Sequence, residues 1–185
     1  MSNRNAATAA DPDAEASADP AVDAGELVVV CGLPGVGKTT VAERVAAHLD
    51  GRVLRTDVIR KELFPDPEYT DEETAAVYAE LLSRARDRIE EGEHIVLDAT
   101  FARREFRENV RAMAEEAADD FDLVKVECEE AVVERRIAAR DGISDADFDI
   151  HLHFKELFDE IDADHYVVDN SGGEAETFAQ VDAEF

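Results

Sequence analysis

A glycine-rich string near the start of the chain carries the residue types that bind phosphate. It runs from Gly32 to Thr39 as GLPGVGKT and matches the pattern G-x-x-x-x-G-K-[ST] at every position. Glycines let the backbone turn its N–H groups toward phosphate oxygens, and a helix starting near Lys38 adds the positive end of its dipole. We expect Lys38 to reach the β- and γ-phosphates and the Thr39 hydroxyl to bind Mg²⁺. The predicted nucleotide-binding residues are Gly32, Pro34, Gly35, Val36, Gly37, Lys38, Thr39 and Thr40.

The segments on either side of this string are those that a phosphate-binding loop requires. An almost continuous apolar run, ELVVVC at 26–31, precedes it and predicts a strand buried on both faces. An amphipathic helix is expected over 38–49, with apolar residues at four-residue spacing. A Gly-rich turn without function explains neither the Lys-Thr pair nor these flanks.

A second candidate site begins at Asp57, which follows a short predicted strand and opens a helix that also carries Arg60. The carboxyl ends of parallel strands line the ligand crevice of an open α/β sheet, so both side chains are expected to face a phosphate acceptor. Asp57 can accept the proton of an attacking hydroxyl, and Arg60 can hold the acceptor. The alternative is that Asp57 only caps the helix and Arg60 is a solvated charge.

The strand predicted at 94–97 delivers Asp98 and Thr100 to the same edge of the sheet. Asp98 ends an apolar run, as the acidic residue of a Walker B strand does, and is predicted to orient Mg²⁺ or to contact the acceptor. Thr100 is a candidate for a hydrogen bond to the substrate. Both residues could instead be ordinary turn residues.

Arg136 and Arg140 lie four residues apart on a predicted helix over 130–140 and therefore share a face. Such a pair can neutralise the charge of a triphosphate in the transition state. The alternative is a solvated face paired with nearby carboxylates. A local basic stripe is expected on the helix after Asp98, formed by Arg103, Arg104, Arg107 and Arg111 and explained mostly by surface salt bridges to Glu105, Glu108 and Glu115.

Motifs of other nucleotide-binding classes are missing from the sequence. No Asn is followed by Lys, so the guanine-reading string of GTPases is absent. The single Asp-x-x-Gly string, Asp169 to Gly172, follows the last predicted strand, where a γ-phosphate switch could not easily form. These observations favour a kinase over a GTPase.

The periodicity of the chain predicts an α/β fold in which short strands alternate with longer helices. Strands are expected at 26–31, 52–56, 94–97, 121–127 and 165–168. Helices are expected at 38–49, from Asp57 to before Pro65, and at 71–91, 103–118, 130–140, 145–161 and 174–181. Thr70 is the predicted N-cap of the long helix, with Glu73 as its capping-box partner. The result is a five-stranded parallel sheet with helices on both faces.

The chain divides into a tail and one domain. Residues 1–25 are mostly Ala, Asp, Ser, Asn and Pro without periodicity and are predicted to be a disordered acidic tail. Residues 26–185 are predicted to form the folded domain. Cys31 and Cys128 have no metal-binding spacing and are expected to be buried thiols in a reducing compartment. With neither a signal peptide nor a membrane span evident in the sequence, a cytoplasmic location is expected.

The chain is strongly acidic, with 46 Asp and Glu against 19 Lys and Arg and a formal net charge of -27. This charge disfavours nucleic acid and anionic membranes as partners. Most of the basic residues are Arg, and only Lys38, Lys61, Lys125 and Lys155 are Lys. Acidity with few lysines is interpreted as adaptation to a salt-rich cytoplasm, where screening relieves self-repulsion.

Four strings in this order resemble the AAA-domain P-loop kinases, a group related to gluconate kinase, chloramphenicol phosphotransferase, zeta toxins and the kinase domain of polynucleotide kinase. They are GLPGVGKTT, RTDVIRKELF, HIVLDATFARREFR and ERRIAARDG. The resemblance covers about residues 26–170 and implies the three-layer sandwich of P-loop NTPases. It implies that Asp57 is the general base, Arg60 an acceptor-binding residue, Asp98 an active-site carboxylate, and Arg136 with Arg140 lid arginines.

The sequence therefore predicts an enzyme that moves the γ-phosphoryl group of MgATP to a hydroxyl group, most simply on a small molecule. One alternative is a polynucleotide or RNA 5′-hydroxyl kinase, which the Asp57 and Arg60 pair favours and the net charge does not. The other is a non-catalytic nucleotide-binding module. A protein that only binds nucleotide needs no carboxylate on the acceptor side, so Asp57 separates the kinases from the binding module.

Overall fold

β1 (Leu27–Cys31) is the central strand of the sheet and is apolar over its whole length. In the computed structural model, which describes residues 23–139 and 145–185, all five of its side chains are buried. A strand covered on both faces needs apolar residues at every position rather than at alternate ones. Val28 and Val30 pack into the core on one face, and Leu27, Val29 and Cys31 pack into the core on the other.

The sheet has five strands in the order β2-β3-β1-β4-β5, and all four pairings are parallel. The other strands are β2 (Arg52–Arg55), β3 (Ile95–Asp98), β4 (Phe121–Glu127) and β5 (Tyr166–Asp169). This confirms the predicted five-stranded parallel α/β sheet. The register pairs Asp98 with both Val30 and Arg55, so the carboxyl ends of β1, β2 and β3 lie level.

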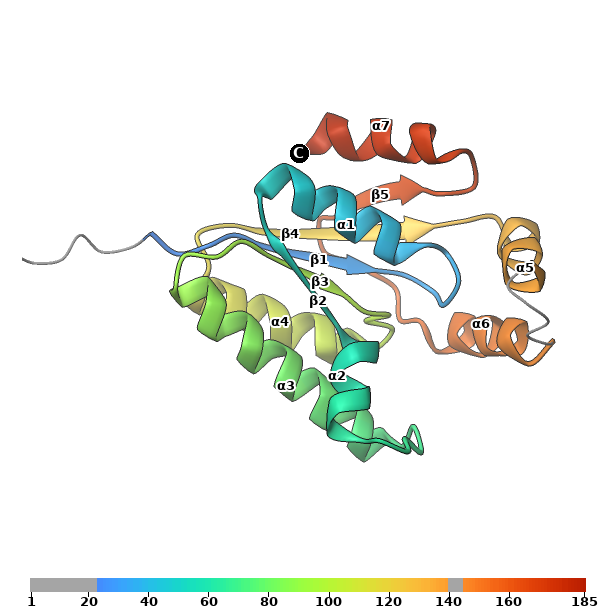
Figure 1. Ribbon diagram of the computed structural model, residues 1–185, viewed down its shortest axis with the longest axis horizontal. Coiled ribbons are helices and arrows are strands. Elements are labelled where there is room, and N and C mark those ends of the chain that lie inside the picture. Colours follow the sequence, from blue (N-terminus) through green and yellow to red (C-terminus); the bar gives the residue numbers. More distant parts are fainter. Residues whose placement is uncertain (1–22, 140–144) are drawn as a thin grey trace, which may run out of the picture.

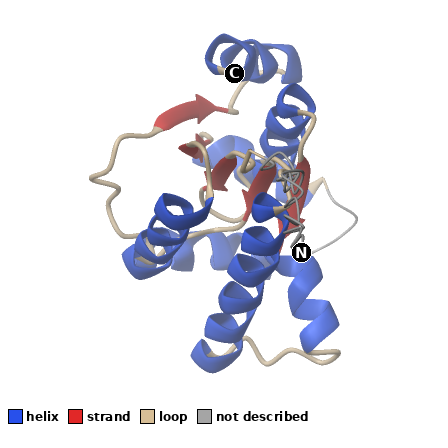
Figure 2. Cartoon of the chain, turned by 90° about the vertical axis from the view of Figure 1, so that its left-hand side faces the viewer, coloured by secondary structure: helices blue, strands red, loops and turns tan. Residues whose placement is uncertain are grey.

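Helices cover both faces of the sheet, giving three layers (Figure 1). α1 (Lys38–Leu49) and α7 (Glu174–Glu184) lie on one face, and α3 (Asp71–Glu90) and α4 (Arg104–Ala117) lie on the other. Figure 2 shows the strands between these helices in a turned view. Near the carboxyl ends of the strands are α2 (Thr56–Leu63), α5 (Glu130–Ala138) and α6 (Asp145–Leu157).

Most element ends fall within a few residues of their predicted positions. Thr70 is the N-cap of α3 and accepts a 3.2 Å hydrogen bond from the Glu73 N–H, as predicted. The carboxylate of Glu73 differs from a regular capping box, because it accepts the N–H groups of Glu68 and Tyr69. The predicted acidic tail, residues 1–25, lies mostly outside the described residues.

Arg107 corrects one expectation. It was expected in a basic stripe paired by surface salt bridges, but its side chain is buried and donates to the carbonyl groups of Phe101, Ala102, Asp159 and Glu160. α6 ends at Leu157 rather than at the predicted residue 161. The residues that follow it form a connection, which Arg107 holds against the loop between β3 and α4. Burial lowers the pKa of Arg107, and hydrogen bonds to four carbonyl oxygens offset part of the cost of placing its charge there.

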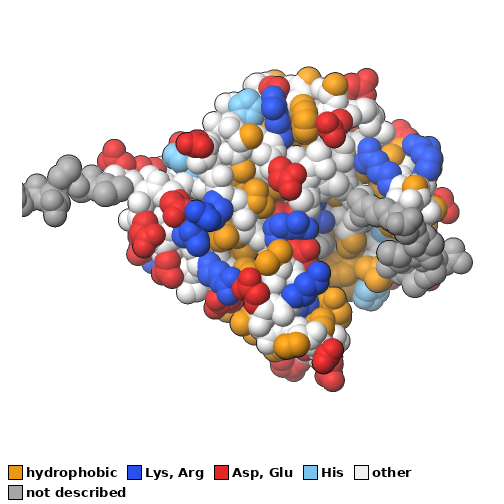
Figure 3. All heavy atoms as spheres, in the orientation of Figure 1, with side chains coloured by type: hydrophobic (Ala, Val, Ile, Leu, Met, Phe, Trp, Pro, Cys, Tyr) orange, Lys and Arg blue, Asp and Glu red, His pale blue; other side chains and the backbone are white. Residues whose placement is uncertain are grey.

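The surface carries basic side chains next to acidic ones (Figure 3). Arg44 donates to both carboxylate oxygens of Asp182, and Arg84 pairs with Glu62 and Glu80. Within residues 23–139 and 145–185, no helix is both long and apolar enough to cross a membrane.

Candidate functional site

The loop between β1 and α1 turns on three glycines with positive φ. Gly32, Gly35 and Gly37 have φ values of 144°, 85° and 92°, a backbone region that residues other than glycine rarely adopt. Gly37 is the N-cap of α1. Because glycine has no side chain, the N-cap residue makes no side-chain hydrogen bond to the first N–H groups of the helix. A Cβ atom at Gly37 would overlap the side-chain amide of Asn170. The glycine pattern therefore serves both backbone conformation and close packing.

Three side chains hold carbonyl groups of this loop. Lys38 Nζ donates to the Leu33 carbonyl at 2.9 Å. Asn170, which follows β5, donates from Nδ2 to the Val36 carbonyl at 2.8 Å. The third contact joins His151 Nδ1 of α6 to the Pro34 carbonyl at 2.7 Å.

Lys38 starts α1 and lies at the centre of the predicted nucleotide site. Burial lowers the pKa of its ammonium group, and the negative charge of Asp98 opposes that shift. Its hydrogen bond to the Leu33 carbonyl keeps it at the loop. Thr39 and Thr40 follow it in the first turn of α1, and both are partly exposed.

Thr39 and Asp98 bring α1 and β3 together. The Thr39 hydroxyl donates to Oδ2 of Asp98 at 2.6 Å, and the Asp98 carboxylate is buried. A hydroxyl and a carboxylate in contact form an oxygen donor set of the kind that Mg²⁺ prefers. Within the described residues, no group of three or more His, Cys, Asp or Glu side chains could hold a metal ion. A Mg²⁺ ion that keeps several waters and binds phosphate oxygens fits this small set of protein ligands.

Asp57 and Asp98 lie on either side of Arg55. Arg55 donates from Nη2 to Asp57 Oδ2 at 2.9 Å, and its Nε lies 3.6 Å from Asp98 Oδ2. That Nε atom is buried and has no hydrogen-bond partner in the part of the chain that the structure describes. Asp57 is more exposed than Asp98, with 55% of its side chain accessible against 6%, so Asp57 is the more open of the two to an acceptor molecule.

Arg60 faces α3 in this structure. It lies 3.5 Å from the Glu73 carboxylate, donates to the Thr74 hydroxyl at 3.2 Å, and stacks on the Tyr69 ring at 4.9 Å. Asp57 and Arg60 share α2, but their side chains have different partners. The arginine that contacts Asp57 is Arg55.

Thr100 contributes its backbone to the site. Its carbonyl accepts the Gly32 N–H at 3.2 Å, which ties the segment after β3 to the start of the glycine loop. The next residue, Phe101, is fully buried with a φ of 48°, and the Tyr78 hydroxyl accepts its N–H. The position of Thr100 is thus set by a fixed turn.

Arg136 lies across the end of α5 and contacts the loop after β5. It donates to the Gly172 carbonyl at 3.3 Å and lies 3.6 Å from Cys128 Sγ. Arg136 is therefore at the β4 and β5 end of the site, and Asp57 is at the β2 end. Arg140, the other predicted lid arginine, lies outside the described residues.

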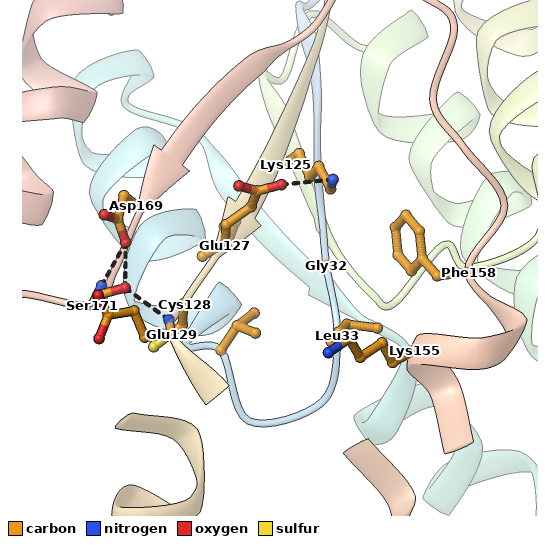
Figure 4. A pocket seen from close by; sticks show the side chains of 12 residues that line it. Gly32, Leu33, Lys125, Glu127, Cys128, Glu129, Lys155, Phe158, Asp169 and Ser171 are labelled. Carbon is orange, nitrogen blue, oxygen red and sulfur yellow. Dashed lines mark hydrogen bonds and ion pairs between the residues drawn. The ribbon is translucent and has the colours of Figure 1, made fainter. Parts of the chain in front are cut away.

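A pocket of about 560 Å³ opens beside the glycine loop (Figure 4). Gly32 and Leu33 form its floor, and Lys155 and Phe158, at the end of α6, form one wall. Glutamates pair with both lysines, Lys125 with Glu127 at 2.7 Å and Lys155 with Glu130 at 2.6 Å. The opposite wall consists of residues at the ends of β4 and β5: Cys128, Glu129, Asp169 and Ser171.

Sequence reasoning missed Arg55, His151 and Asn170. Arg55 could have been found, because it occupies the last position of a strand whose carboxyl end faces the site. His151 and Asn170 gave no such signal, since their partners in the loop are 117 and 134 residues away.

Comparisons with known proteins place the chain in a family. The family model described as "AAA domain" matches residues 27–161. An uncharacterized protein of Mycobacterium tuberculosis is 30% identical over an alignment of 139 positions, which covers 67% of this chain and 28% of that protein. A UPF0200 protein of Aeropyrum pernix is 39% identical over an alignment of 84 positions, which covers 39% of this chain and 44% of that protein. The chain thus spans less than half the length of these relatives.

Solved structures share the fold. A gluconokinase from Sinorhizobium meliloti has a TM-score of 0.64 at 22% identity, covering 88% of this chain and 94% of that one. The Mycobacterium tuberculosis APS kinase CysC in complex with AMPPNP and APS has a TM-score of 0.69 at 20% identity, covering 87% and 97%. At these identities the likeness shows the fold, and the fold is that of P-loop kinases. The family match shows that the chain belongs to the AAA domain family.

Proposed function

We propose that the chain is an ATP-dependent phosphotransferase that moves the γ-phosphoryl group of MgATP to a hydroxyl group of a small molecule. The observation that carries this proposal is the exposed Asp57 carboxylate, which Arg55 links to Asp98 at the edge of the glycine loop. A module that only bound nucleotide would need neither an exposed carboxylate nor a guanidinium beside it.

The loop residues bind the nucleotide in this proposal. Backbone N–H groups from Gly35 to Thr40 surround the phosphates, and Lys38 leaves the Leu33 carbonyl to bridge the β- and γ-phosphates. Thr39 and Asp98 hold Mg²⁺, which neutralises phosphate charge when bound. The 2.6 Å contact between Thr39 and Asp98 supports this assignment.

Asp57 acts on the acceptor. Its carboxylate takes the hydroxyl proton as the acceptor oxygen attacks the γ-phosphorus, and the bond to the β,γ-bridging oxygen breaks to release ADP. Arg55 keeps the Asp57 carboxylate in place, and Thr100 and Arg60 are assigned to the acceptor side. Arg136, and Arg140 outside the described residues, neutralise charge on the transferred group.

A transfer assay tests the proposal. The protein is incubated with MgCl₂ and ATP labelled in the γ-phosphate, in buffer containing molar KCl, with panels of polyols, amino alcohols, nucleosides and 5′-hydroxyl oligonucleotides. The Lys38→Ala variant, purified in parallel, measures contaminating kinases.

We expect label on a small hydroxyl compound with the wild-type protein and not with the variant. Label on oligonucleotides alone would identify a 5′-hydroxyl kinase instead. Nucleotide binding without transfer to any panel would favour a binding module and contradict the proposal.

A further inference from the structure

His151 is buried although it lies on α6 at the molecular surface. Its side chain and backbone together are only 2% exposed, and Nδ1 lies 2.7 Å from the Pro34 carbonyl oxygen. A carbonyl oxygen only accepts hydrogen bonds, so Nδ1 must carry the hydrogen. The contact joins α6 directly to the glycine loop, 117 residues away in sequence.

This contact fixes the direction of a phosphate-binding donor. In a trans peptide unit the carbonyl of one residue and the N–H of the next point in opposite directions. Holding the Pro34 carbonyl toward α6 therefore turns the Gly35 N–H the other way. By contrast, the Leu33 carbonyl that Lys38 holds is followed by Pro34, which has no N–H, so Lys38 can leave it without disturbing a donor.

Asn170 also fixes the direction of a peptide unit in the loop, but it belongs to a different part of the fold. Its Nδ2 holds the Val36 carbonyl, and its Oδ1 accepts the Thr177 hydroxyl at 2.8 Å. Asn170 follows β5 and Thr177 is on α7, so this contact ties the loop to the body of the fold. His151 alone ties the loop to α6 among these three carbonyl contacts.

The face of α6 that carries His151 also reaches the pocket. Phe148, three residues earlier, stacks on the imidazole with 5.7 Å between ring centroids and an angle of 6°. Lys155, four residues later, lines the pocket beside Gly32 and Leu33, and so does Phe158, which directly follows the helix (Figure 4). Residues at these spacings share a helical face. One face of α6 therefore touches the glycine loop and forms a wall of the pocket.

We propose that His151 is a positioning residue that couples nucleotide occupancy of the glycine loop to the placement of α6, and so to the pocket that α6 lines. The inference rests on the proposed function only in that the loop binds nucleotide. Such coupling is reciprocal: if the His151 contact favours the loop conformation that binds phosphate, bound phosphate strengthens the contact equally.

The test uses the full chain and four variants. His151→Asn keeps a donor at the position of Nδ1, whereas His151→Gln moves the donor outward and His151→Leu removes it. His153→Leu is the matched control, because His153 is an exposed histidine on the same helix. AMPPNP with Mg²⁺ is the probe, and its dissociation constant is measured by calorimetry.

We expect His151→Leu and His151→Gln to bind AMPPNP about three- to tenfold more weakly than the wild type, the usual effect of one hydrogen bond. His151→Asn and His153→Leu should stay within about twofold of it. Equal affinity of all five proteins would overturn the coupling.

Hydrogen exchange of α6 separates positioning from a merely structural role. In the wild type, His151→Asn and His153→Leu, AMPPNP should slow amide exchange in 149–157, and in His151→Leu and His151→Gln this nucleotide-dependent protection should be lost. A structural role would change exchange equally with and without AMPPNP and would leave the difference intact, which would contradict the proposal.

Neither measurement needs an acceptor. Coupling that is observed in a protein without transferase activity would therefore overturn the proposed function and leave this inference standing.

Discussion

The Thr39 hydroxyl donates a 2.6 Å hydrogen bond to the Asp98 carboxylate, so the first turn of α1 and the last residue of β3 meet at one point. Asp98 is paired in register with Val30 near the end of β1 and with Arg55 at the end of β2. Three adjacent strands therefore deliver the glycine loop, the buried carboxylate and the Arg55–Asp57 pair to one edge of the sheet.

Lys38→Ala should abolish phosphoryl transfer and weaken ATP binding, because it removes the side chain placed to bridge the β- and γ-phosphates. Transfer is measured with labelled ATP, and binding by calorimetry. Thermal unfolding of the variant controls for loss of fold. Turnover close to the wild-type rate would refute the kinase assignment.

Asp57→Asn should keep nucleotide affinity and lose most transfer, by about 10²- to 10⁴-fold, because an amide cannot take up the acceptor proton. Asp57 is an exposed residue in the first turn of α2 rather than its N-cap, so stability should change by less than about 1 kcal/mol. Asp98→Asn is the contrasting variant and should also raise the Mg²⁺ concentration needed for half-maximal transfer. An Asp57→Asn variant that transfers phosphate at the parent rate would exclude Asp57 as the base.

Arg55→Gln should lower the rate of transfer while leaving AMPPNP binding almost unchanged, because the hydrogen bond and ion pairs of Arg55 are with Asp57 and Asp98. Arg52→Gln is the matched control, since Arg52 begins β2 and pairs with Glu93. Steady-state kinetics of both variants measure the effect on the rate of transfer. Equal rates in the two would show that Arg55 has no part in the reaction.

The protein should be more stable in molar KCl than in dilute buffer. Its formal net charge is -27, so the acidic side chains repel one another, and salt screens that repulsion over a few ångströms. The melting temperature, measured across a KCl series at constant pH, should rise with salt. A flat or falling series would remove the interpretation that the composition reflects a salt-rich cytoplasm.

Stability should fall as the pH rises from about 9 to about 11, in part through Cys31. Burial raises the pKa of this thiol from 9.0 to about 11, although the positive charges of Arg107, Lys38 and Lys125 oppose the shift. The unfolded chain therefore ionises first, and the stabilising effect is complete below pH about 9 and lost as the pH rises to about 11.

Urea unfolding of wild type and Cys31→Ala at several pH values isolates this effect. The free-energy difference between the two proteins should shrink by about 3 kcal/mol across that range, at 1.36 kcal/mol per pKa unit. A difference that stays constant with pH would show that Cys31 ionises equally in both states.

Sequence patterns predicted those features that depend on neighbouring residues. The loop, the all-apolar β1 and the Thr70 cap each follow from residues a few positions apart. Arg107 was misjudged because its spacing fits a solvated helix face, whereas two of its four carbonyl partners belong to a connection more than 50 residues later. The contacts of His151 and Asn170 are of the same kind: each side chain hydrogen-bonds a backbone carbonyl, which any residue type could supply.

The contact between Asn170 and Val36 limits when, during synthesis, the growing chain can bind nucleotide. Synthesis proceeds from the N-terminus, so the glycine loop leaves the ribosome long before Asn170 and Thr177 do. Until those residues arrive, the Val36 carbonyl lacks the partner that holds it in the folded protein. Nascent chains that end before β5 should therefore bind ATP poorly, although they carry the whole phosphate-binding motif.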